Sequence, residues 1–161
     1  MQSDATLSDA FVHAARTWPT CDCLTIWSSS DDEVVERLSF QAFLARAVGA
    51  SSQLRNGFGV ETGVYVCVLS APVTGCFVCM AGIMLSGGVV VSGNYKLSPD
   101  RLAAAVVSTG ASLVVTSAAN VTLCAEAGRA FDLFGQIRTI RLDGPAAVSY
   151  THLTLPTTPY V

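Results

Sequence analysis

Few side chains in this sequence stand where they could do chemistry. A triphosphate is held by a flexible loop that offers backbone N–H groups and a cation, whereas Thr116-Ser117-Ala118-Ala119 is small and polar but has neither glycine nor lysine. Lys96 is the only lysine, and we expect His13 to lie on the solvated side of a helix. The motifs of a nucleophile elbow, a zinc protease or a dinucleotide fingerprint do not occur. We therefore assign no catalytic, cofactor-binding or metal-binding residue.

The six cysteines are the other candidates. Cys76 and Cys79 have the spacing of a metal or redox pair, but their segment is apolar and has no second pair at ligand distance. Cys21 and Cys23 would complete a site only if the fold brought them near. The polar, acidic start shows no secretory signal, so we expect a cytoplasmic protein with reduced thiols. Buried thiols that act as small hydrophobic side chains explain the pattern.

Composition restricts the class of protein. With 161 residues the chain can build one domain with a sizeable core. Hydrophobic residues make up 51% and charged residues 13%, which excludes a disordered tail. The net charge is −3 and the basic residues are scattered, so no nucleic-acid surface is expected.

A run without any charge extends from Thr62 to Tyr95. By length, its segment 64–91 could cross a bilayer, and a membrane-associated protein anchored by this run is one alternative, separable by carbonate extraction. Pro72 and several glycines interrupt the run, however, and valines gather at its ends. No aromatic belt or basic cluster marks either boundary. We therefore favour a buried strand–helix–strand unit.

Apolar periodicity predicts the elements around this run. Predicted strand starts near 64, 89, 113 and 137 repeat at the length of a βα unit, about 24 residues. Continuous valine and leucine runs are typical of parallel strands buried on both faces. The predicted fold class is α/β: a partial layered α/β domain with a mostly parallel sheet built from βα units, preceded by a helix and a β-hairpin. The predicted helices are 7–18, 40–57, 73–85, 99–109 and 119–131, and the predicted strands are 23–27, 34–38, 64–69, 89–91, 113–116 and 137–142.

Two helices have predicted core faces. The helix that follows Ser39 is expected to bury Phe40, Phe43, Leu44, Ala47, Val48 and Leu54. The helix that follows Ser98 is expected to bury Leu102, Val106 and Val107. Ser39 and Ser98 are suitable N-cap residues, and Pro99 suits a first helical position.

The last fourteen residues, 148–161, differ from the rest of the chain. They contain four threonines and two prolines, no charged residue and no helical or strand period. The first ten can be encoded by a nucleotide string that resembles the transposon-end adapter of sequencing libraries. A genuine Thr/Pro-rich tail is the other interpretation. We predict two segments: 1–147, a truncated part of a larger domain, and 148–161, a non-native tail.

Several short motifs occur in one order along the chain. They are Thr6-Leu7-Ser8-Asp9, Leu38-Ser39-Phe40-Gln41-Ala42-Phe43, the turn 59–66, the glycine-containing segment 86–95 followed by Leu97-Ser98-Pro99-Asp100-Arg101-Leu102, and Gly110-Ala111-Ser112-Leu113-Val114-Val115-Thr116. In this order they resemble the N-terminal region of the adenylate-forming enzymes, the AMP-dependent synthetase/ligase superfamily that includes acyl-CoA synthetases. The resemblance covers roughly residues 6 to 142. Ser92 and Tyr95 stand where the family usually has proline, and Val64 where it has an acid.

The resemblance implies an ATP-dependent carboxylic acid–thiol ligase as the parent protein. Such enzymes form an acyl-adenylate and pass the acyl group to a thiol, so the parent would use ATP, Mg and coenzyme A and act on a small carboxylic acid, as in fatty acid metabolism. The family's phosphate loop and catalytic lysine have no counterpart here, so we expect this fragment to be inactive and free of cofactors. A small, complete α/β binding module is the alternative, which a soluble and cooperatively melting monomer would favour.

Overall fold

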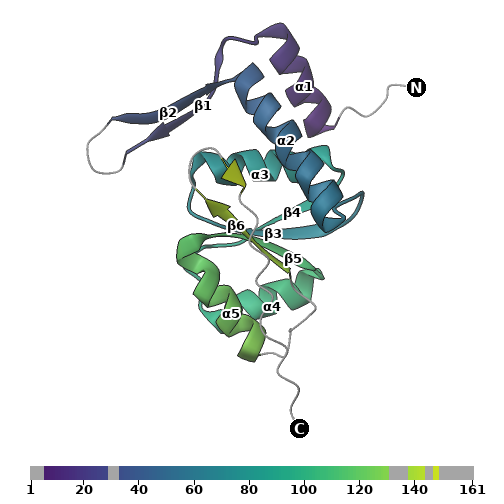
Figure 1. Cartoon of the computed structure of the whole chain (residues 1–161), viewed down its shortest axis with the longest axis vertical. Coiled ribbons are helices and arrows are strands. Elements are labelled where there is room, and N and C mark those ends of the chain that lie inside the picture. The colour runs from purple at the N-terminus through teal and green to yellow at the C-terminus, as the bar shows by residue number, and fades with distance from the viewer. Residues whose placement is uncertain (1–5, 29–32, 131–137, 144–146, 149–161) are drawn as a thin grey trace.

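The computed structural model describes residues 6–28, 33–130, 138–143 and 147–148 (Figure 1). A helix and a hairpin come first, and a layered α/β unit follows. The helices are α1 (Leu7–Thr17), α2 (Phe40–Phe58), α3 (Thr74–Leu85), α4 (Pro99–Thr109) and α5 (Val121–Ala130), with a 3-10 turn at Ala118–Asn120. The strands are β1 (Asp22–Trp27), β2 (Val34–Ser39), β3 (Tyr65–Leu69), β4 (Val89–Ser92), β5 (Leu113–Ser117), β6 (Arg138–Asp143) and β7 (Ala147–Val148).

Local signals explain where the first helices begin and end. Thr6 and Asp9 form a capping box at α1, in which each side chain accepts the other residue's backbone N–H. The Ser39 hydroxyl accepts the N–H of Ala42 at 3.2 Å and so caps α2. At the other end of α2, Gly59 adopts φ 66°, a left-handed conformation that suits glycine. Between the two helices, β1 and β2 form the predicted antiparallel hairpin.

The main sheet has the strand order β4-β3-β5-β6-β7. Its first four strands are parallel, and β7 pairs with β6 in the antiparallel direction. The strands β3 and β5 lie in the centre, where four consecutive residues of each are buried. The predicted α/β class, with its mostly parallel sheet behind a helix and a hairpin, is thus confirmed.

Helices cover both faces of this sheet (Figure 1). On one face, α2 and α3 pack against Val66, Val68, Leu113 and Val115. On the other face, α4 and α5 pack against Cys67, Leu69 and Val114. Alternate residues of each central strand therefore serve two separate apolar cores, as strand geometry requires. The charge-free run forms β3, α3 and β4, the predicted strand–helix–strand unit.

Two predicted core positions are wrong. Val48 is 52% exposed and Val107 is 61% exposed. The buried residues of α2 follow the narrow stripe Phe43, Ala47, Ala50, Ser51, Leu54 and Phe58, and Val48 is rotated away from it by its place next to Ala47. Val107 is displaced in the same way from Leu102, Ala103 and Val106 on α4. On each helix, the buried stripe is narrower than the apolar composition suggests.

The remaining differences concern element ends. Helix α2 extends one residue beyond its predicted end at residue 57, to Phe58, and the predicted helix 119–131 is a 3-10 turn followed by α5. Ser98 does occupy the N-cap of α4, but its side chain makes no capping hydrogen bond. Residues 131 and 137 lie outside the described residues, as does the predicted non-native tail apart from Val148.

Candidate functional site

The carboxyl ends of β3, β4 and β5 meet at one edge of the sheet, and this carboxyl edge is the natural place to look for a site. After β3 the chain enters α3 on one face, whereas after β5 it enters α5 on the opposite face. Strands β3 and β5 are parallel neighbours. The connection after β3 leads to β4 on one side of this pair, and the connection after β5 leads to β6 on the other side, so the strand order reverses between them. In open α/β sheets, ligands bind outside the carboxyl ends of strands at such a switch point.

Hydrogen bonds within the chain close this edge. The hydroxyl of Thr116, at the end of β5, is buried and donates to the carbonyl oxygen of Leu69 at 2.9 Å. The N–H of Gly93, directly after β4, donates to the carbonyl oxygen of Val68 at 2.9 Å. Hydrogen bonds therefore join the carboxyl ends of neighbouring strands, and the Thr116 hydroxyl donates its hydrogen within the chain.

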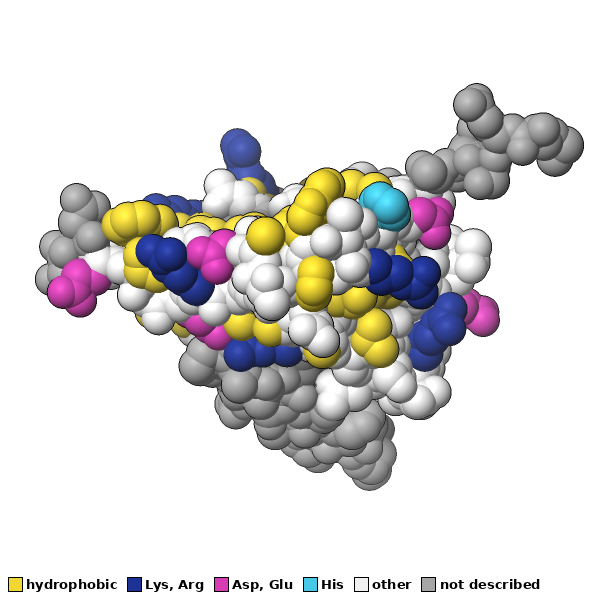
Figure 2. Space-filling view, turned by 90° about the horizontal axis from the view of Figure 1, so that it is seen from above, with side chains coloured by type: hydrophobic (Ala, Val, Ile, Leu, Met, Phe, Trp, Pro, Cys, Tyr) yellow, Lys and Arg dark blue, Asp and Glu magenta, His cyan; other side chains and the backbone are white. Residues whose placement is uncertain are grey.

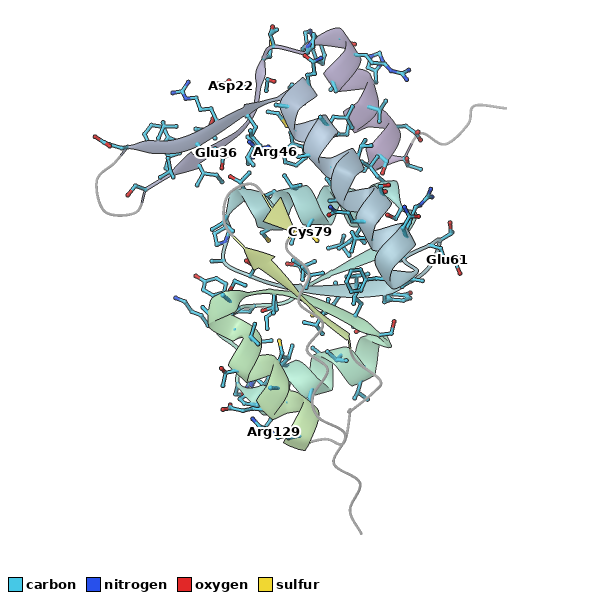
Figure 3. The ribbon with its side chains drawn as sticks, viewed as in Figure 1. Asp22, Glu36, Arg46, Glu61, Cys79 and Arg129 are labelled. Atoms are coloured by element: carbon cyan, nitrogen blue, oxygen red, sulfur yellow. The ribbon has the colours of Figure 1, made fainter. Side chains whose placement is uncertain are left out.

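The hairpin supplies a carboxylate to the same edge. The Thr74 hydroxyl, in the first turn of α3, donates to Glu36 Oε2 at 2.5 Å. Arg46 Nη1 of α2 donates to Glu36 Oε1 at 2.8 Å, and Figure 3 shows these two side chains where the hairpin approaches α2 and α3. The hydrogen bond from Thr74, followed by the hydrogen bond and charge of Arg46, lowers the pKa of Glu36. The beginning of α3, where backbone dipoles favour an anion, thus lies beside a carboxylate of the chain itself.

The small polar stretch at the end of β5 forms a turn. Thr116 and Ser117 complete the strand, and Ala118–Asn120 form the 3-10 turn that leads into α5. Lys96 lies in the loop after β4, where its N–H donates to the side chain of Asn94 at 2.9 Å. Its Nζ lies 5.6 Å from the centre of the Tyr95 ring. The fold thus brings the two sequence candidates to the same edge of the sheet, on different loops.

The six cysteines are all free thiols. Cys76 and Cys79 are buried among apolar side chains of α2, α3 and the sheet, and burial raises the pKa of both, that of Cys79 to about 12. Burial also raises the pKa of Cys124, to about 11. Such thiols are poor nucleophiles and metal ligands because both roles need the thiolate. Within the described ranges, no group of His, Cys, Asp and Glu side chains is arranged to hold a metal ion.

Sequence analysis did not single out Glu36. The useful signal is strand alternation: Val34, Glu36 and Leu38 share one face of β2, and Leu38 is buried. An acidic residue on the inward face of a strand needs a partner. Its partners Thr74 and Arg46 could not be named without the fold, because Glu36 and Thr74 lie 38 residues apart.

No helix in the described part of the chain has the length and apolar character needed to cross a membrane. On the face shown in Figure 2, basic and acidic side chains are interspersed rather than gathered by sign.

Comparison with known proteins gives a consistent result. A family model described as AMP-binding enzyme matches residues 11–154. A protein named as a long-chain-fatty-acid CoA ligase from Rhodopseudomonas palustris has a similar structure, with a TM-score of 0.73 and 24% identity over 91% of this chain and 36% of its own. A benzoate CoA ligase from Burkholderia xenovorans has a TM-score of 0.68 and 18% identity over 87% of this chain and 26% of its own.

A third similar structure is the N-terminal subdomain of NpsA from Klebsiella oxytoca, with a TM-score of 0.62 and 16% identity over 70% of this chain and 27% of that one. The chain therefore spans about a third, or less, of the length of these solved structures. At these identities the likeness concerns the fold. No curated protein sequence matches the chain significantly. Because the family model matches most of its length, the chain belongs to the family of AMP-binding enzymes.

Proposed function

We propose that this chain is the N-terminal part of an ATP-dependent carboxylic acid–thiol ligase of the acyl-CoA synthetase type. The observation that carries the proposal is the family match over residues 11–154, and the similarity in fold to two CoA ligases supports it. The whole enzyme would join a carboxylic acid to AMP and then transfer the acyl group to coenzyme A. Fatty acid metabolism is the process to which we assign it, and six free thiols fit a cytoplasmic location.

The described residues do not fit a triphosphate. At the switch point, the Thr116 hydroxyl donates to Leu69, and the start of α3 lies beside the negative charge of Glu36. A phosphate there would have to displace the Glu36 carboxylate, which already accepts from Thr74 and Arg46. We therefore assign ATP, Mg and coenzyme A to parts of the enzyme outside this region, and we propose that the 161-residue chain alone is inactive and binds none of them.

Pyrophosphate release tests this proposal. The 161-residue chain and the product of the complete reading frame are each incubated with ATP, Mg and a panel of aliphatic and aromatic carboxylic acids. We expect acid-dependent release only from the complete product. Sustained release by the short chain refutes the proposal, as does a complete reading frame that encodes no glycine-rich phosphate loop with a lysine. Resequencing across codon 148 tests the proposed non-native origin of 148–161, and a native codon run there refutes it.

A further inference from the structure

We draw no further inference here: the strongest candidate, the outer edge of strand β4 in the main sheet, carries none because nothing in the described part of the chain shows what covers it.

Discussion

Two glycines in neighbouring helices should respond in opposite ways to the same substitution. Gly49 in α2 has nothing within 4 Å of the place where a Cβ would stand. Gly82 in α3 faces α2, and a Cβ there would lie 2.9 Å from Ala50 Cβ, 3.1 Å from the Ser51 backbone nitrogen and 3.2 Å from the Ala47 carbonyl oxygen. The glycine is thus what allows the two helices to approach so closely.

The magnitude follows from two opposed effects. Replacing a glycine inside a helix with alanine stabilises the helix by about 0.5–1 kcal/mol, because glycine loses more backbone entropy on folding. At Gly49 only this gain applies. At Gly82 two of the three contacts are with backbone atoms, so α2 and α3 must separate, and overpacking of this kind costs about 1–3 kcal/mol. The separation would also strain the buried hydrogen bond between the Ser51 and Ser86 hydroxyls, 2.9 Å long.

Urea unfolding followed by circular dichroism measures both effects. All samples are kept at one low chain concentration, so that self-association does not alter apparent stability. We expect Gly49→Ala to raise the free energy of unfolding by about 0.5–1 kcal/mol and Gly82→Ala to lie about 1–3 kcal/mol below Gly49→Ala. Equal stabilisation by the two substitutions would refute the close approach of α2 and α3 through Gly82.

Three further predictions concern the carboxyl edge and the thiols. Glu36→Gln should lower the free energy of unfolding at neutral pH by about 1 kcal/mol. Because the pKa of Glu36 is lowered from 4.5 in the folded chain, the stability difference between the variant and the unmodified chain should shrink as the pH falls below 4.5. A difference that does not change with pH would contradict the role of the carboxylate. Thr116→Val removes the donor to the Leu69 carbonyl and should cost about 1 kcal/mol in urea unfolding, whereas an unchanged midpoint would contradict that bond. In a native thiol assay the exposed Cys21 should react first and the buried Cys79 last, and all six should react in denaturant; rapid reaction at Cys79 would contradict its burial.

Most of the fold was predictable because its elements are local. The strands at Tyr65, Val89, Leu113 and Arg138 begin within a residue of the positions that apolar runs indicate. Glycine positions also predicted the end of α4, where Gly110 adopts φ 70°. Sheet order was not predictable in this way, since β5 inserts beside β3 rather than beside β4. That choice depends on which face each connecting helix covers, and apolar periodicity alone carries no such information.

The candidate site was predictable only in part. Sequence analysis considered the stretch 116–119 and Lys96 but assigned no site residue, and the fold places both at the carboxyl edge. The carboxylate at this edge comes from Glu36 in the hairpin, which lies 38 residues before its partner Thr74 in the sequence. Alternation along β2 could indicate that Glu36 points inward, but its partners lie on α2 and α3, which the sequence alone does not place beside the hairpin. Long-range contacts of this kind are decided by the assembled core.

The closed carboxyl edge bears on how a nucleotide-dependent enzyme could use this region. In open α/β sheets ligands bind at the switch point, and here the Thr116 hydroxyl donates to the Leu69 carbonyl oxygen and the Glu36 carboxylate lies beside the start of α3. A phosphate near the start of α3 would have to compete with the Glu36 carboxylate for Thr74 and Arg46, which both donate to it. Under the proposed function, we therefore expect the nucleotide to be bound mainly by parts of the enzyme outside this region. On this view, Glu36→Gln removes the negative charge that pairs with Arg46 but does not create a phosphate site, because the stretch 116–119 at the same edge has neither glycine nor lysine. Tight ATP binding by the Glu36→Gln variant of the 161-residue chain would show the opposite, namely that the carboxylate alone had been keeping the nucleotide away.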